Sequence, residues 1–193
     1  MKDRFKGKAK RWFVVGGLLL LMSITSVGYV QAAAVLSEDE IKSLTYIREE
    51  EKLARDVYIY LYDMWGSGVF DNISVSEQTH MDAIRTLLDR YRLDDPAAGN
   101  DLGVFDNPEL KALYTELIKG GSESLIYALR VGVFIEVTDI ASLTQGIATA
   151  EHKDIKTVYT NLRKGSQNHW DAFCSNLVKL GVMTCEPYEL PEP

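Results

Sequence analysis

Four long stretches of this sequence contain almost no proline or glycine, and their apolar residues recur at intervals of three and four. This is the periodicity of an amphipathic α-helix, and no stretch of comparable length alternates as a β-strand would. The first predicted helix begins at residues 37–40, Ser-Glu-Asp-Glu, which form a capping-box pattern, and it ends at 66–68, Gly-Ser-Gly. The other three run through 70–91, 122–147 and 155–180. We therefore predict an all-α protein.

A connection of about twenty-five residues separates the second helix from the third, which is too long for a simple hairpin loop. Within it, residues 109–119 are predicted to form a short helix, and Ser122 is expected to cap the third main helix. His152, beside Glu151 at the start of the fourth helix, is interpreted as a surface or capping residue. Two helical hairpins joined by one long crossover define a known class of four-helix bundle.

Each of the four apolar stripes is interrupted near its middle by polar side chains. A carboxylate buried in a core is unfavourable unless it is paired or binds a metal. One such residue in one helix could be a satisfied core polar group, but one or more in every helix of the bundle indicates a common site. The residues are Glu51 in the first helix, Glu77 and His80 in the second, Glu136 and Asp139 in the third, and Ser166 and His169 in the fourth.

Several of these residues have a simpler interpretation. Glu51 belongs to the acidic run 49–51, and such runs usually face solvent, so only Glu51 is predicted to point inward. Glu77 forms a capping-box pattern with Ser74, although the apolar stripe continues upstream of both. His169 taken alone would more often be an ordinary core histidine.

The pair Glu77 and His80 is the strongest element of the pattern, because residues three apart on a helix project together and can bind one metal. Glu51 followed seven residues later by Tyr58, and then by Glu77-x-x-His80, resembles the first half of the rubrerythrin and ferritin-like pattern. The segments 48–58, 76–81 and 165–169 resemble more closely a bacterial family of domains of unknown function, family twenty-two-zero-two, which is classed with the ferritin-like proteins. The resemblance covers roughly residues 36–180. It implies a ferritin-like four-helix bundle and assigns no settled activity.

The sequence departs from the ferritin-like pattern in the second hairpin. The fourth helix carries Ser166-x-x-His169 where that pattern implies a Glu-x-x-His pair, so one carboxylate is missing. Asp139, one turn after Glu136, is a spatial substitute. The expected metal ligands are therefore Glu51, Glu77, His80, Glu136, Asp139 and His169. Ser166 and Tyr58 are candidates for neighbours that contact the ligands, and simple core packing is the alternative for Tyr58.

Oxygen and imidazole ligands without thiolate suit iron or manganese, and zinc or copper could compete. We expect two divalent ions, with iron favoured, and a di-iron oxidase or peroxidase that uses a small oxidant and an external electron donor. Glu77 and Glu136 are expected to bridge the ions, and Glu51 and Asp139 to be terminal ligands. The alternative is a metal-binding or protein-interaction module at the cell surface that has no turnover, which Ser166 favours. The sequence also allows an oligomer.

Residues 1–34 have the basic start, apolar centre and A-x-A ending of a secretory signal, and an uncleaved membrane anchor is the alternative. The rest of the chain, with 15 basic and 27 acidic residues, carries a net charge of −12, which argues against binding to nucleic acid or to anionic lipid. We expect an extracytoplasmic protein. In that compartment Cys174 and Cys185 favour a disulfide that pins the tail, residues 183–193, to the bundle formed by residues 35–182.

Overall fold

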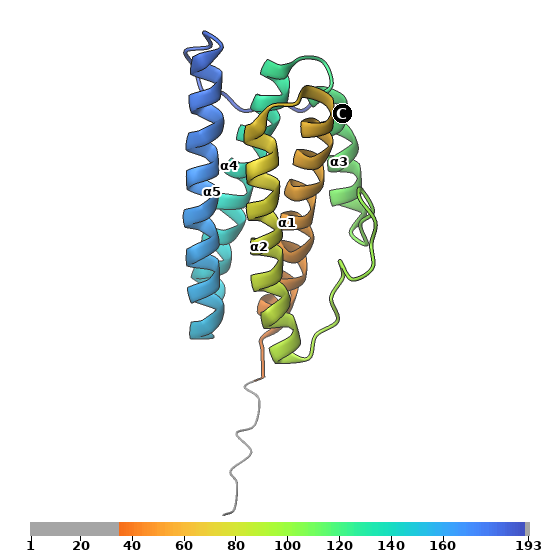
Figure 1. Ribbon diagram of the computed structural model, residues 1–193. Coiled ribbons are helices and arrows are strands. Elements are labelled where there is room, and N and C mark those ends of the chain that lie inside the picture. Colours follow the sequence, from red (N-terminus) through yellow and green to blue (C-terminus); the bar gives the residue numbers. More distant parts are fainter. Residues whose placement is uncertain (1–34, 192–193) are drawn as a thin grey trace, which may run out of the picture. The chain divides into compact units, whose positions relative to one another are not determined.

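The computed structural model describes residues 35–191, which form five helices and no strand (Figure 1). The predicted signal peptide or anchor, residues 1–34, lies outside the described residues, as do residues 192 and 193 of the tail. Within 35–191, no helix combines the length and apolar character that a membrane span requires. The helices are α1 (Glu38–Trp65), α2 (Gly68–Tyr91), α3 (Pro108–Gly121), α4 (Leu125–Thr149) and α5 (Lys153–Lys179).

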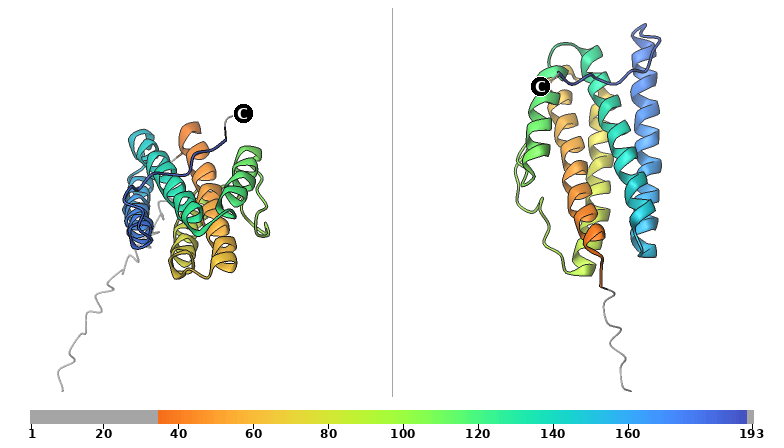
Figure 2. Two further views of the ribbon diagram at one scale, coloured as in Figure 1. Left: turned by 90° about the horizontal axis from the view of Figure 1, so that it is seen from above. Right: turned by 180° about the vertical axis from the view of Figure 1, so that it is seen from behind.

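Four of the helices form the predicted bundle of two hairpins. Helix α1 packs against α2, α4 packs against α5, and the hairpins meet through α1 with α4 and through α2 with α5. Neighbouring helices are antiparallel: near the start of α1, Ser43 lies beside Gly146 near the end of α4. The crossover and α3 run along the outside of the bundle, where α3 packs against α1 and α4 (Figure 2). The all-α prediction is confirmed.

The helix ends differ from the prediction in one place. The capping box at Ser37 is present, and α1 stops at Gly66, which adopts a left-handed φ of 62°. Helix α3, however, continues through Gly120 and Gly121, and Ser122 follows its end. Ser124 caps α4 instead, so the predicted cap at Ser122 is wrong. The absence of a side chain at Gly121 lets α3 pack closely against α1, because a Cβ there would lie 2.8 Å from the side chain of Leu61.

The core consists of two apolar clusters separated by a polar layer. One cluster surrounds Tyr58, Phe70 and Phe173, whose rings pack 5.2–6.2 Å apart. The other surrounds Leu44, Leu143 and other aliphatic residues near the opposite end of the bundle. The predicted inward stripes are largely confirmed, but Leu180 at the end of α5 is exposed. The polar residues noted in the sequence lie between the two clusters.

The acidic run 49–51 is buried along its whole length, contrary to the prediction for its first two residues. The crossover covers this side of α1. Glu49 accepts hydrogen bonds from the backbone N–H groups of Asp106 and Asn107, 2.6 and 3.1 Å away. Lys52 pairs with Asp56 and also donates to the carbonyl of Asp101. The charged residues on the outer face of α1 therefore fasten the crossover to the bundle.

Glu40 connects the first turns of α1 and α5. It completes the capping box with Ser37, and its carboxylate also accepts bonds from the backbone N–H groups of Glu151 and His152 at 2.8 and 2.9 Å. The ring of His152 lies 2.9 Å from the same carboxylate. Burial raises the pKa of Glu40, but the hydrogen bonds from His152, Ser37 and Glu151 outweigh it and lower that pKa to about 2.

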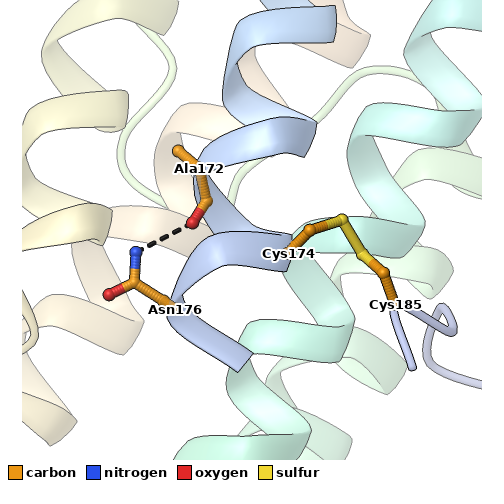
Figure 3. Close-up of a disulfide and its surroundings, with 4 residues drawn as sticks. All are labelled: Ala172, Cys174, Asn176 and Cys185. Atoms are coloured by element: carbon orange, nitrogen blue, oxygen red, sulfur yellow. Dashed lines mark hydrogen bonds between the residues drawn. A yellow bond between two sulfur atoms is a disulfide. The ribbon is translucent and has the colours of Figure 1, made fainter. Parts of the chain in front are cut away.

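The C-terminal tail is held to the bundle at Cys185 and at Tyr188. A disulfide joins Cys174 in α5 to Cys185, with the Cα atoms 5.2 Å apart (Figure 3). Beyond it, the backbone N–H of Tyr188 donates to the carbonyl of Arg130 in α4 at 2.9 Å. The ring of Tyr188 packs against Gly120 so closely that a Cβ on this glycine would lie 2.2 Å from the ring. The tail therefore extends from α5 across α4 to α3.

Replacing Glu40 should destabilise the protein in a pH-dependent way. The pKa of Glu40 is lower in the folded protein than the ordinary value of 4.5, so its contribution to stability is complete above pH 4.5 and is lost as the pH falls toward 2. Glu40→Gln should lower the free energy of unfolding by about 2–3 kcal/mol at pH 7, and by much less near pH 2.5. Urea denaturation at several pH values measures this difference. Glu38→Gln, at an exposed position of the same turn, is the control. A pH-independent difference for Glu40→Gln would contradict the assignment.

Reducing the disulfide should lower the free energy of unfolding by about 2–3 kcal/mol, because the bond closes a loop with a sequence separation of 11 residues. Urea denaturation with and without a thiol reductant measures the change. The double variant Cys174→Ser, Cys185→Ser should start at the lower stability and show no response to the reductant. Equal stability of the oxidised and reduced chains would contradict the prediction.

Candidate metal centre

The polar layer brings together the residues that interrupt the four helical stripes. Helix α1 contributes Glu51, α2 contributes Glu77 and His80, α4 contributes Glu136 and Asp139, and α5 contributes Ser166 and His169. The four carboxylates are at most 4% exposed, whereas each imidazole is 8% exposed. The acidic side chains therefore lie at the centre of the layer, and the imidazoles lie nearest to solvent.

Glu77 lies between the two histidines. Its Oε2 is 2.8 Å from Nδ1 of His80, and its Oε1 is 2.8 Å from Nδ1 of His169. The imidazole rings stack with their centroids 5.3 Å apart. One ligand atom from each of these three residues falls within 4.8 Å of the other two, which is close enough for a shared metal ion.

A second carboxylate accompanies each imidazole. Oε2 of Glu51 lies 3.1 Å from Nδ1 of His80, and Oε2 of Glu136 lies 3.5 Å from Nδ1 of His169. Tyr58 donates a hydrogen bond of 2.6 Å to Oε1 of Glu136. The cluster is thus divided into a Glu51 and His80 side and a Glu136 and His169 side, with Glu77 common to both.

Asp139 and Ser166 form a pair of their own beside this cluster. The Ser166 hydroxyl donates to Oδ2 of Asp139 and is fully buried. The second oxygen of Asp139, Oδ1, has no hydrogen-bond partner within the described residues. Ser166 therefore orients a neighbouring carboxylate and leaves one oxygen of Asp139 available as a ligand atom.

Burial raises the pKa values of the three carboxyl groups other than Glu77. Burial and the proximity of Glu77 raise the pKa of Glu136 to about 7. Burial also raises the pKa values of Glu51 and Asp139 well above their ordinary values, and the charge of Glu77 adds to the effect for Glu51.

For Glu77, the two imidazoles outweigh the effect of burial on the pKa. Burial raises its pKa, but hydrogen bonding to His169 and His80 lowers that pKa to about 2. Burial lowers the pKa values of the two histidines, yet the carboxylates around them raise these to about 11 for His80 and about 9 for His169. Without a metal, the protons on the imidazoles therefore offset the buried negative charge.

The geometry fits a divalent metal better than a closed hydrogen-bond network. Oε1 of Glu77 and Nδ1 of His169 are paired with each other at 2.8 Å. Within the described residues, Oε1 of Glu51 and Oδ1 of Asp139 have no hydrogen-bond partner. Buried polar atoms without partners are rare in folded proteins. Two such atoms lie in this cluster, and carboxylate oxygens beside imidazole nitrogens are the ligand set of iron, manganese or zinc.

Two residues at the site have roles that the sequence interpretation did not assign. Ser76 lies 2.8 Å from Nε2 of His169, although it stands outside the apolar stripe of α2. Gly165 lies against His80, because a Cβ at this position would be 2.5 Å from Nε2. Both residues belong to the segments on which the family resemblance rests, and this was the signal that could have identified them.

Gly165→Ala should destabilise the protein, although the same change in an ordinary helix interior stabilises it by up to about 1 kcal/mol. The added methyl group would force His80 away from Glu51 and Glu77. Thermal unfolding measures the effect. Gly68→Ala is the control, because a Cβ there has nothing within 4 Å. A melting temperature of Gly165→Ala at or above that of the parent chain would contradict the assigned packing.

Comparison with known proteins places this architecture in a family. Residues 40–190 match the family described as "Uncharacterized protein domain (DUF2202)". The uncharacterized protein MJ0754 of Methanocaldococcus jannaschii is 49% identical over 146 residues, which are 76% of this chain and 79% of that protein. A crystal structure of the hypothetical protein MJ0754 from Methanococcus jannaschii has a TM-score of 0.76 at 46% identity, covering 81% of this chain and 87% of that chain. The chain therefore belongs to the DUF2202 family.

Proposed function

We propose that this chain is a ferritin-like di-metal carboxylate protein and that it acts as a di-iron oxidase or peroxidase. The observation that carries the proposal is the position of Glu77, which lies 2.8 Å from an imidazole nitrogen on each side. A carboxylate placed in this way can bridge two ions. The Glu-x-x-His pair of α2, the inward carboxylates of α1 and α4, and the imidazole of α5 correspond in part to the ligand pattern of di-iron bundles.

The contacts divide the ligands between two positions. Glu51 and His80 would hold one ion, Glu136 and His169 the other, and Glu77 would bridge them. Glu136 was expected to bridge as well, but its Oε1 accepts a hydrogen bond from Tyr58 and only its Oε2 faces His169, which favours a terminal role. Asp139 has one unpaired oxygen and remains a candidate terminal ligand.

Bound there, a pair of iron(II) ions would supply two electrons, enough to reduce hydrogen peroxide to two water molecules when two protons are added. The residues of the chain would orient the ligands and exclude bulk water. The phenol of Tyr58, fully buried beside Glu136, would hold that ligand in place. An external donor would have to return the two electrons. The signal-like pattern of residues 1–34 and the disulfide are the features that support an extracytoplasmic location in this proposal.

A second candidate function is metal binding without turnover. Ser166 favours it, because this residue stands where the ferritin-like pattern has a fourth glutamate. The hydroxyl of Ser166 donates to Asp139 and supplies no negative charge of its own. The two functions share the metal site and differ only in whether bound iron(II) reacts with the oxidant.

Metal content tests the site itself. The full chain loaded with iron(II) under anaerobic conditions and then desalted should retain about two ions per chain. Glu77→Gln should retain less than one, because it removes the charge of the bridging carboxylate while keeping its size. Glu49→Gln is the matched control: it changes a buried glutamate of α1 that binds the crossover instead of the cluster. Helical circular dichroism verifies that each variant is folded.

Two outcomes would contradict the proposal. If the parent chain retains no iron, or if folded Glu77→Gln retains as much as the parent, this cluster is not the di-metal site. If two ions are retained but iron(II) is oxidised by peroxide no faster than in Glu77→Gln, the site binds metal without turnover.

A further inference from the structure

The two imidazoles face the carboxylates with the same atom but differ at the other nitrogen. Both present Nδ1 to Glu77. On the outer side, Nε2 of His169 lies 2.8 Å from the Ser76 hydroxyl. Nε2 of His80 packs against Gly165, and no hydrogen bond reaches this nitrogen from the part of the chain that the structure describes. One imidazole is therefore held at both nitrogens, and the other at one.

We propose that Ser76 is a positioning residue for His169 and makes the two metal positions unequal, with tighter binding on the Glu136 and His169 side. This inference rests on the proposed di-metal function. It adds an order to the site: the first ion occupies the position with the oriented imidazole, and the second occupies the position of Glu51 and His80.

The chemistry of a histidine ligand explains the difference. A neutral imidazole that binds metal through Nδ1 carries its proton on Nε2. A hydrogen bond from Nε2–H to the Ser76 oxygen fixes this tautomer and the orientation of the ring, so less conformational freedom is lost when the metal binds. Partners of this kind typically change metal affinity by 10–100-fold. His80 has close packing against Gly165 in place of such a partner.

Ser76 could also serve only to hold α2 against α5, since its hydroxyl contacts a residue of the other helix. A structural role of this kind would lower stability and affect both metal positions alike. A positioning role should affect one binding step and depend on the hydroxyl group itself. The test must therefore resolve the two binding steps and compare a substitution that keeps the hydroxyl.

Cobalt(II) titration of the full chain, followed by visible absorption, resolves the two steps. In Ser76→Ala the tighter step should weaken by about 10–100-fold, with the weaker step unchanged. Ser76→Thr keeps the hydroxyl and should restore most of the affinity. Ser74→Ala is the matched control on the same helix, because the Ser74 hydroxyl donates to the backbone carbonyl of Asp71 and does not contact the cluster.

The outcomes separate this inference from the proposed function. Two cobalt ions bound by the parent chain and bound equally well by Ser76→Ala would overturn the role of Ser76 and leave the di-metal site standing. Equal weakening of both steps together with a lower melting temperature of the metal-free variant would also overturn it. No cobalt binding by the parent chain would overturn the proposed function and this inference with it.

Discussion

The structure depends on how the bundle tolerates four carboxyl groups in its centre. Glu51, Glu77, Glu136 and Asp139 are all removed from water, and their mutual repulsion would oppose folding if all four were ionised and unpaired. Four side chains offset this effect directly. The two imidazoles flank Glu77, the phenol of Tyr58 donates to Glu136, and the hydroxyl of Ser166 donates to Asp139. Carboxylate oxygens of Glu51 and Asp139 nevertheless remain without a hydrogen-bond partner among the described residues. A divalent metal would both coordinate such oxygens and neutralise their negative charge.

The surrounding fold accounts for the rigidity that such a layer requires. An apolar cluster closes the layer on each side, and the aromatic group of Tyr58, Phe70 and Phe173 packs directly beside Glu136. Phe173 can approach α4 only because Gly132 has no side chain: a Cβ there would lie 2.6 Å from its ring. Glu40 joins the starting turns of α1 and α5, while the tail ties α5 to α4 at the opposite end of the bundle. Helix α5 is thus joined to α1 at its start and to α4 beyond its end, which restricts how His169 can move relative to the ligands of those helices.

Most of the bundle could be predicted from the sequence because helical periodicity is a local property. The inward positions of Glu51, Glu77 and Glu136 follow from the same rhythm as their apolar neighbours. The burial of Glu49 and Lys52 could not be predicted, because it depends on where the crossover lies, and the crossover has no periodicity. The cap lies at Ser124 because α3 continues through two glycines, and these glycines pack closely against Tyr188 and Leu61 in contacts that the local sequence does not indicate. Ser76 lies one residue before Glu77, and its contact with α5 is a tertiary contact that no pattern within α2 indicates.

Ser166 is the residue at which the two hairpins differ most in the ligands that they supply. In a symmetric di-metal bundle each hairpin would supply the same ligands, but here the second hairpin supplies Glu136, His169 and the Asp139–Ser166 pair. Oδ2 of Asp139 is occupied by the hydroxyl, so Asp139 can offer a metal one oxygen where a glutamate at 166 could have offered two. The two hairpins supply equal numbers of carboxylates and imidazoles but arrange them differently. In the proposed di-metal site, this asymmetry would let one ion be held firmly while the other stayed more accessible to a small oxidant.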